Sequence, residues 1–316
     1  MKPRLTAGRI GEKQCPVISG FTVQSKPDSL SRKNGLRNYD AKNHIAHENI
    51  IFTQNFVEGM DIASQQQERY RWNDAYARHF QQTEYWRSNT YRKIRVGYIS
   101  GNFRSYAATY AFAPLIFNHN PDQFEVVCYA DQQGGDSLTE LLMAKATLWR
   151  EVANKSDEQI AHLIVDDRID ILVDCAGFQK GNRLLVFARK PAPIQVTGWG
   201  EPTGTGLPTM DYLLADPVLI PACERHLFAE KVVDLPCFLG YWVANPLPEP
   251  GPLPLIHNGH VTFGSFNRGA KHTDTTLALW AKTLNSVPNS TLLLKAPEWG
   301  SLEKRTRLLD RFASYR

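Results

Sequence analysis

Cysteine is scarce in this 316-residue sequence and is not arranged for disulfide or metal chemistry. The five cysteines (Cys15, Cys128, Cys175, Cys223 and Cys237) form no CxxC pair, and their number is odd. The nine histidines include no i,i+4 pair of the kind that holds zinc on a helix. We therefore expect no metal site, and the cysteine usage is typical of a protein from the reducing cytoplasm.

Long apolar runs and a strong charge of one sign are also missing. No run reaches the length that spans a membrane, and the first residues lack the apolar core of a signal peptide, so no membrane partner is expected. The net charge is +4, but residues 1–45 hold nine Lys and Arg against three Asp and Glu. The remaining chain is near neutral, which argues against a nucleic-acid partner. We interpret residues 1–46 as a polar, basic and disordered tail.

Several catalytic fingerprints are absent as well. The chain has no G-x-S-x-G elbow, so a hydrolase triad has no support. It has no G-x-G-x-x-G after a strand and no Walker loop, which disfavours a nicotinamide oxidoreductase or a P-loop NTPase. We find no repeat of 30–50 residues, which argues against a solenoid.

What the sequence does contain is an alternation of strand and helix patterns, which predicts an α/β fold with a doubly wound parallel sheet. The strands are predicted at residues 94–99, 124–129, 149–152, 169–173 and 194–197, and the helices between them at 107–117, 137–146 and 156–164. Five prolines in residues 242–257 predict a stiff extended linker. The domains are then a helical lead-in (47–91), a Rossmann-like domain (92–241), the linker (242–258) and the incomplete start of a second domain (259–316).

Two turns have the composition of ligand-binding loops. Residues 200–206 place three glycines around two threonines, which suits a cradle for a sugar or phosphate; the alternative is a tight turn between buried strands. Residues 264–271 form a strand-to-helix turn that ends in Lys271, and a helix N-terminus with an adjacent cation favours a phosphate. The alternative there is an ordinary surface lysine.

Five segments, in order, resemble the catalytic region of O-linked N-acetylglucosamine transferases, both the bacterial proteins and the SPINDLY-type enzymes. The segments are RVGYISGNF, HNPDQFEVVCYA, DILVDCAGFQKGNR, RKPAPIQVTGWGEPTGTGLPTMDYLLAD and FGSFNRGAKHTDTTLALWAKTLNSVPNSTLLLK. The resemblance implies a GT-B fold, in which two Rossmann-like domains face each other across a cleft. It also implies metal-independent, inverting transfer from UDP-GlcNAc to Ser or Thr hydroxyls of a protein or peptide, with no cofactor.

The resemblance also assigns site residues. Lys271 matches the lysine that neutralises the departing diphosphate, and Tyr106 stands at a position where the family commonly has histidine. The loop on the sugar and acceptor side corresponds to Gly177, Phe178 and Gln179. The donor-binding positions are Gly200, Pro202, Thr203, Gly204, Thr205, Asn267 and Arg268.

Four departures from the family pattern bear on activity. Tyr106 replaces a histidine and a phenol is a poor general base at neutral pH, while Phe178 cannot exchange a proton. Glu201 replaces a tyrosine, and Thr203-Gly204 inverts the usual Gly-Thr. The competing hypothesis is a non-catalytic or truncated relative that acts as a binding domain or is a relic. The sequence also leaves open whether the sugar is GlcNAc or fucose.

Overall fold

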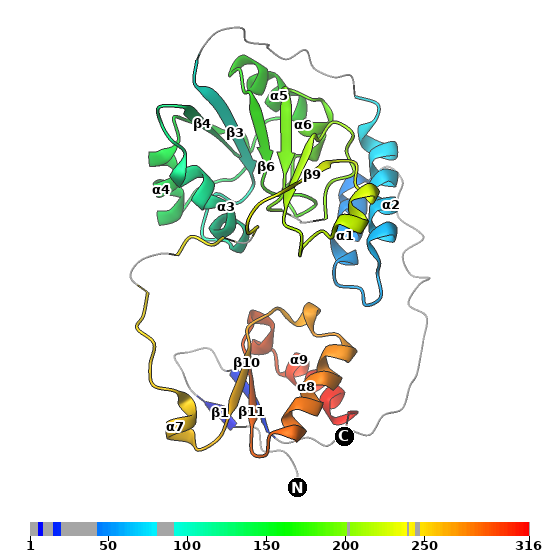
Figure 1. Cartoon of the computed structure of the whole chain (residues 1–316), viewed down its shortest axis with the longest axis vertical. Coiled ribbons are helices and arrows are strands. Elements are labelled where there is room, and N and C mark those ends of the chain that lie inside the picture. The colour runs from blue at the N-terminus through cyan, green and yellow to red at the C-terminus, as the bar shows by residue number, and fades with distance from the viewer. Residues whose placement is uncertain are drawn as a thin grey trace. The chain divides into compact units, whose positions relative to one another are not determined.

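The computed structural model describes residues 6–8, 15–19, 43–80, 92–200, 203–238, 240–243 and 247–315. The chain divides into a large unit (residues 35–247) and a small unit (residues 1–34 with 248–316), and each has its own sheet (Figure 1). Among the described residues, no helix is long and apolar enough to cross a bilayer.

The large unit is built around a parallel sheet of seven strands in the order β5-β4-β3-β6-β7-β8-β9. Its strands are β3 (Ile94–Ser100), β4 (Phe124–Ala130), β5 (Leu148–Glu151), β6 (Ile171–Asp174), β7 (Ile194–Thr197), β8 (Tyr212–Ala215) and β9 (Lys231–Asp234). The first strand of this sheet in the sequence, β3, lies inside the sheet, and the chain adds strands first on one side of it and then on the other. The point where the strand order reverses lies between β3 and β6, and open α/β sheets bind ligands there. This confirms the predicted α/β class.

Helices cover both faces of this sheet. They are α1 (His44–Gln54), α2 (Ile62–Trp72), the π-helical turn η1 (Asn73–Ala77), α3 (Ala107–Asn118), α4 (Ser137–Lys145), α5 (Asp157–Asp166), α6 (Leu184–Ala188) and the 3-10 helix η2 (Ala222–Leu227). Helix α5 begins as the sequence predicts, because the hydroxyl of Ser156 accepts a hydrogen bond from the N–H of Gln159.

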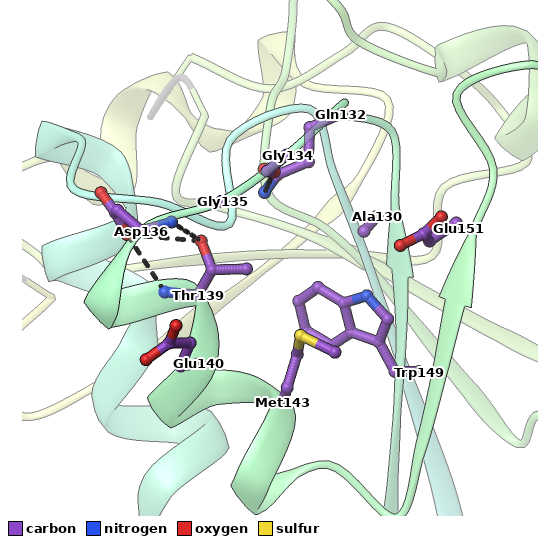
Figure 2. Close-up of a pocket in the computed structure, with 10 residues that line it drawn as sticks. All are labelled: Ala130, Gln132, Gly134, Gly135, Asp136, Thr139, Glu140, Met143, Trp149 and Glu151. Atoms are coloured by element: carbon purple, nitrogen blue, oxygen red, sulfur yellow. Dashed lines mark hydrogen bonds between the residues drawn. The ribbon is translucent and has the colours of Figure 1, made fainter.

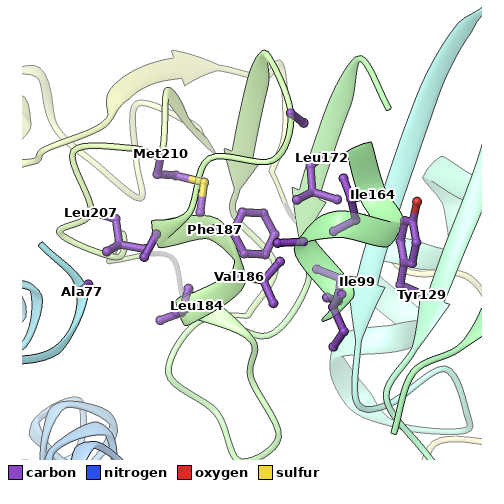
Figure 3. Close-up of a cluster of buried hydrophobic side chains, with 14 of the residues drawn as sticks. Ala77, Ile99, Tyr129, Ile164, Leu172, Leu184, Val186, Phe187, Leu207 and Met210 are labelled. Atoms are coloured by element: carbon purple, nitrogen blue, oxygen red, sulfur yellow. The ribbon is translucent and has the colours of Figure 1, made fainter. Parts of the chain in front are cut away.

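Alternate residues of the strands enter two separate cores. Val96 and Tyr98 of β3 pack with α3 and α4 on one face, whereas Ile99 packs with α5 and α6 on the other. In the second core, Phe187 of α6 lies close to Leu172 of β6 (Figure 3). A parallel strand with helices on both faces has to be apolar on both, which is why these strands are continuous apolar runs.

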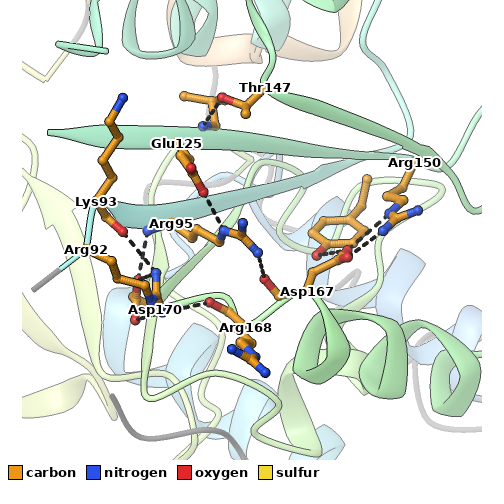
Figure 4. Close-up of polar contacts among 11 residues, drawn as sticks. Arg92, Lys93, Arg95, Glu125, Thr147, Arg150, Asp167, Arg168 and Asp170 are labelled. Carbon is orange, nitrogen blue, oxygen red and sulfur yellow. Dashed lines mark hydrogen bonds and ion pairs between the residues drawn. The ribbon is translucent and has the colours of Figure 1, made fainter. Parts of the chain in front are cut away.

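The amino edge of the same sheet carries a network of ion pairs (Figure 4). Arg92 and Asp170 form two hydrogen bonds of 2.9 Å, and Arg95 contacts Glu125 at 2.5 Å. Asp167 accepts from Arg150 at 2.6 Å and from the hydroxyl of Tyr129 at 2.8 Å. The contacts of Arg92 and Arg95 join the starts of β3, β4 and β6, and Asp167 ties the end of α5 to β4 and β5.

The small unit has a mixed sheet in the order β1-β2-β11-β10. Its elements are β1 (Thr6–Gly8), β2 (Cys15–Ser19), α7 (Pro254–Asn258), β10 (Thr262–Ser265), η3 (Gly269–Lys271), α8 (Asp274–Ser286), β11 (Thr291–Leu294), η4 (Pro297–Gly300) and α9 (Leu302–Ala313). Strands β10 and β11 are parallel, and β2 pairs antiparallel with β11. Leu277 of α8, Leu294 of β11 and Phe312 of α9 are fully buried in its core.

Two expectations for the connecting stretches need correction. Residues 1–46 were expected to be without structure, but β1 and β2 lie there and α1 already begins at His44. Strand β2 is short and its pairing with β11 is non-local, so composition gave no sign of it. The segment predicted to be extended throughout contains α7, which Pro254 begins at the first helical position, where a missing N–H costs nothing.

We predict that the segment between the units is the first site of proteolytic cleavage. Residues 247–259 are all exposed, and such segments are preferred sites of nicking. Brief digestion with a broad-specificity protease should cut between residues 243 and 259 and leave the large sheet intact, as read by the masses of the fragments. First cuts scattered through residues 94–216 would contradict the division into two units.

Candidate functional site

The candidate site of the large unit lies at the carboxyl edge of the sheet, where β3 and β6 end side by side. The loop after β3 (residues 101–106) and the loop after β6 (residues 175–183) both start at the reversal of strand order. The two loops approach closely, since a Cβ added to Gly101 would lie 3.0 Å from the carbonyl oxygen of Gly181. Two of the sequence-predicted residue groups, Tyr106 and the 177–179 loop, thus meet at one place.

Asp174, the last residue of β6, holds the start of its loop. Its carboxylate accepts hydrogen bonds from the N–H groups of Ala176 (3.0 Å) and Gly177 (3.0 Å) and from the hydroxyl of Thr197 (2.7 Å). The side chain is buried, and this burial raises the pKa of Asp174, while the hydrogen bonds act in the opposite direction. The carboxylate therefore fixes the turn after β6 and ties it to the end of β7.

Gly200 lies directly against this turn. A Cβ at Gly200 would come within 1.9 Å of the carbonyl carbon of Ala176, so only glycine fits. The sequence suggested that the glycines of this loop leave room for a ligand. At Gly200 the room is taken by the peptide between Ala176 and Gly177.

Gln179, in the loop after β6, connects through its side-chain amide to the loops that follow β3 and β7. Its Nε2 donates to the carbonyl oxygen of Gly200 at 2.5 Å, and its Oε1 accepts from the hydroxyl of Tyr106 at 3.3 Å. Tyr106 also precedes α3 as its N-terminal flanking residue and is 38% exposed, so its ring is accessible. Tyr106, Gln179 and Gly200, all predicted from the sequence, form one hydrogen-bonded row.

Phe178 lies on the opposite side of its loop from this row. It is 1% exposed and contacts Trp72 edge-on, with 5.3 Å between ring centroids. The guanidinium of Arg69 lies over its ring at 5.7 Å. Phe178 was predicted as part of the sugar- and acceptor-side loop, but the structure places its side chain in the core beneath α2.

The polar groups of residues 203–205 are engaged with the protein itself. Arg69 donates to the hydroxyl of Thr203 (2.5 Å) and to the carbonyl oxygen of Gly204 (3.1 Å). The N–H and the hydroxyl of Thr205 both donate to Oε1 of Glu230, at 2.5 and 2.6 Å. Burial raises the pKa of Glu230. Arg69 thus docks the loop on α2, and Glu230 docks it beside the start of β9. Pro202 was also predicted to bind the donor; it lies outside the described residues, as does Glu201.

The remaining predicted residues belong to the turn after β10 in the small unit. Asn267, Arg268 and Lys271 are exposed there. Lys271 ends η3, three positions before α8, whose first turn is capped by the hydroxyl of Thr273. Within the described residues no hydrogen bond or ion pair engages its ammonium group, which leaves it available to an anion.

The turn that carries Lys271 is braced from the side facing the core. The N–H of Gly269 donates to a carboxylate oxygen of Glu298. His272 is 3% exposed and its ring stacks on Trp299, with centroids 5.7 Å apart, and meets Trp280 edge-on at 5.0 Å. The packing of His272 between these two indoles, directly after Lys271, limits how far the lysine backbone can move.

Sequence reasoning did not identify Asp174, Arg69 or Glu230 as residues that organise the site. Asp174 reads as the polar end of a strand, and the other two act on a loop far away in the sequence. The one feature of the local sequence that marks these three residues is a charged side chain within an otherwise apolar segment.

Comparisons with known proteins agree on one family. The family model described as Glycosyl transferase family 41 matches residues 72–243. The chain is 34% identical over 281 residues to a probable UDP-N-acetylglucosamine–peptide N-acetylglucosaminyltransferase, SPINDLY, of Arabidopsis thaliana; the match covers 85% of this chain and 30% of that protein. A second relative from Arabidopsis thaliana, SEC, carries the same enzyme description and is 31% identical over 231 residues, which is 70% of this chain and 24% of SEC.

A solved structure shows the same similarity in three dimensions. A mutant of the O-GlcNAc transferase of Thermobaculum terrenum is 31% identical to this chain and superimposes with a TM-score of 0.81. The superposition covers 86% of this chain and 52% of the other. The chain thus spans between a quarter and a third of the length of these curated relatives and about half of the solved structure.

We predict that Asp174→Asn destabilises the large unit by about 1–3 kcal/mol, because an amide NH₂ would replace one acceptor oxygen and leave a buried N–H or hydroxyl without its partner. The measurement is urea denaturation, with amide exchange at Ala176 and Gly177 as the local readout. Asp122→Asn is the matched control: Asp122 is exposed, and its replacement should change stability by less than about 0.5 kcal/mol. Equal effects of the two substitutions would refute the bracing role of Asp174.

Proposed function

Because the chain belongs to glycosyltransferase family 41, we propose that it transfers N-acetylglucosamine from UDP-GlcNAc to Ser or Thr hydroxyls of proteins or peptides. The observation that carries this proposal is the family match over residues 72–243, which includes the carboxyl edge of the large sheet and all the loops described there. The names of the relatives supply the donor and the acceptor class.

We assign the stabilisation of the leaving group to the turn after β10. As the bond between sugar and diphosphate breaks, negative charge grows on the β-phosphate, and an oriented cation stabilises that charge more than it stabilises the bound donor. Lys271 is exposed, is fixed by the brace at Gly269 and His272, and lies beside the N-terminus of α8. This arrangement supports metal-independent transfer, because the lysine supplies the positive charge. Inversion at the sugar carbon belongs to the same proposal, since a direct attack by the acceptor hydroxyl needs no covalent enzyme intermediate.

We assign acceptor-side positioning to Tyr106 and Gln179. The Tyr106 hydroxyl and the Gln179 amide already form one hydrogen bond, and a sugar or acceptor hydroxyl can join this row without disrupting the loops. The phenol orients a hydroxyl by hydrogen bonding and does not act as a strong base.

We place the protein in a reducing compartment such as the cytoplasm. Cys128 and Cys175 are buried thiols and Cys223 is an exposed one, and exposed thiols of this kind persist where glutathione keeps them reduced.

The first test is turnover by the full chain. We expect release of UDP from UDP-GlcNAc together with a peptide mass increase of one N-acetylhexosamine; a parallel reaction with a fucosyl donor tests the other sugar. Absence of turnover with both donors would favour a non-catalytic binding domain.

Given turnover, Lys271→Ala should lower kcat by about 10²–10³, which corresponds to about 3–4 kcal/mol of transition-state stabilisation. Lys282→Ala is the matched control, because Lys282 is an exposed lysine on α8 of the same unit, and it should leave kcat unchanged. If Lys271→Ala keeps kcat within about threefold of the unmodified enzyme, the leaving-group role is wrong.

Tyr106→Phe removes only the hydroxyl and its hydrogen bond to Gln179. We expect a much smaller loss, of less than about tenfold in kcat/KM, since one neutral hydrogen bond contributes about 1 kcal/mol. Steady-state kinetics over a range of acceptor concentrations gives this ratio. A loss as large as that of Lys271→Ala would make the phenol a proton-transfer group and overturn the positioning role.

A further inference from the structure

Polar side chains that face a cavity or the core usually serve the fold. In a cavity of about 250 Å³ beside α4, for example, the carboxylate of Asp136 accepts a hydrogen bond from the N–H of Thr139 at 3.1 Å and caps the helix (Figure 2). The imidazole of His272, the residue after Lys271, has no such task. His272 is 3% exposed, and within the part of the chain that the structure describes neither of its ring nitrogens has a hydrogen-bond partner.

A histidine at this position costs free energy that an apolar residue would not. A neutral imidazole carries one N–H donor and one acceptor nitrogen, and both lose their hydrogen bonds to water when the ring is buried without partners. The phenyl ring of a phenylalanine could lie between Trp299 and Trp280 without that loss. A polar group that is kept at a cost in stability indicates a task other than packing.

One indole contacts the turn of Lys271 at both of its ends. The ring of His272 stacks on Trp299, with the two planes 11° apart. At the other end of the turn, a Cβ added to Gly269 would lie 2.9 Å from the same indole, so the backbone there is in close contact with it. The carbonyl oxygen of His272 also accepts a hydrogen bond from Arg311 at 2.9 Å. If the imidazole left Trp299, this single hydrogen bond would hold the lysine's end of the turn.

The stacked position suits a neutral imidazole better than an imidazolium. Loss of water on burial is the largest influence on the ring and lowers the pKa of His272; the Glu298 carboxylate on η4 raises it, and the Arg311 guanidinium on α9 lowers it. Asp274 on α8 is bonded to Arg311, and the Lys271 side chain is exposed. An indole face attracts a cation, but this attraction returns less free energy than burial of an unpaired charge costs.

A proton therefore favours the unstacked ring. Because the stacked imidazole binds a proton less readily than an imidazole in water does, a fall in pH shifts the equilibrium between the two positions toward the one in water. At neutral pH and above, both positions hold a neutral ring, and packing on the two indoles keeps it stacked.

We propose that His272 is a pH-sensitive switch for the turn that carries Lys271. In the closed state the neutral ring lies between Trp299 and Trp280 and fixes the turn. In acid, a proton from the solvent binds one ring nitrogen, the imidazolium moves out to water, and the turn is released. The effect on catalysis rests on the proposed function: a released Lys271 is no longer oriented toward the departing diphosphate, so transfer becomes slower in acid.

The direct test follows the ring and the turn by NMR and needs no turnover. The Cε1–H signal of His272, assigned by its loss in His272→Phe, should titrate at a lower pH than that of N-acetyl-histidine amide in the same buffer. Through this titration, the protection of the Gly269 and Lys271 amides from exchange should fall at least about tenfold. The amide of Leu292 in β11 reports on unfolding of the whole unit and should keep its protection.

Variants without a titrating ring separate the switch from a general effect of acid. His272→Phe keeps the shape of the ring, and His272→Leu is a second chain without a titrating group at this position. In both, the protection of Gly269 and Lys271 should not change over the pH range in which His272 titrates. An equal loss of protection in these variants would overturn the switch, as would titration of His272 with no change in the amides.

The link to catalysis is tested with the pH profile of turnover. We expect kcat, rather than the KM for the donor, to fall at least about tenfold as His272 is protonated, and the kcat of His272→Phe to show no such step. Lys271→Ala should also lack the step, because there is no lysine left to release; a structural role unrelated to the lysine would retain it. Release of the turn without any turnover would defeat the proposed function alone. Turnover with the same acid step in His272→Phe would defeat the switch alone.

Discussion

The arrangement of the loops at the carboxyl edge of the large sheet depends on the hydrogen bonds of one buried carboxylate, that of Asp174. A carboxylate without water costs several kcal/mol unless donors surround it, and here two backbone N–H groups and one hydroxyl do so. These hydrogen bonds fix the turn after β6. Gly200 packs against the peptide between Ala176 and Gly177 of that turn, and Gln179, two residues further on, bonds to the carbonyl oxygen of Gly200. A substitution at Asp174 would therefore also disturb Tyr106, whose hydroxyl is hydrogen-bonded to Gln179 of the same loop.

The two edges of the sheet are stabilised by different means. The amino edge is joined by ion pairs of Arg92 and Arg95, which fix the starts of β3, β4 and β6 relative to one another. The carboxyl edge combines hydrogen bonds to backbone groups with one cluster of ion pairs, in which Arg183 contacts Asp131 at 2.8 Å and Asp157 at 2.9 Å. Arg183 therefore ties the loop after β6 to the end of β4 and to the start of α5.

The sequence predicted the repeating part of the fold well and the long-range part poorly. Strands such as β3, β4 and β7 are continuous apolar runs, and their bounds agree with the prediction to within a residue. Strand β9 was missed, because its four residues alternate too briefly to show a period, and β2 was missed because its partner is distant. In the site, the row of Tyr106, Gln179 and Gly200 follows from strand order. The inward position of Phe178 does not, because it depends on the packing of Trp72 from another helix.

The docking of α2 on residues 203–206 has a consequence for the order in which the chain acquires its structure during synthesis. Arg69 bonds to Gly204, 135 residues further along, so the ribosome must add about 135 residues before that partner exists. At about 5–20 residues per second this takes roughly 7–27 s, a long time compared with the microseconds in which a helix forms. During this interval the Arg69 guanidinium, which is fully buried in the finished protein, has no Gly204 to bond to. Helix α2 therefore forms well before the loop that covers its Arg69 side, and a nascent-chain chaperone can reach that side in the meantime.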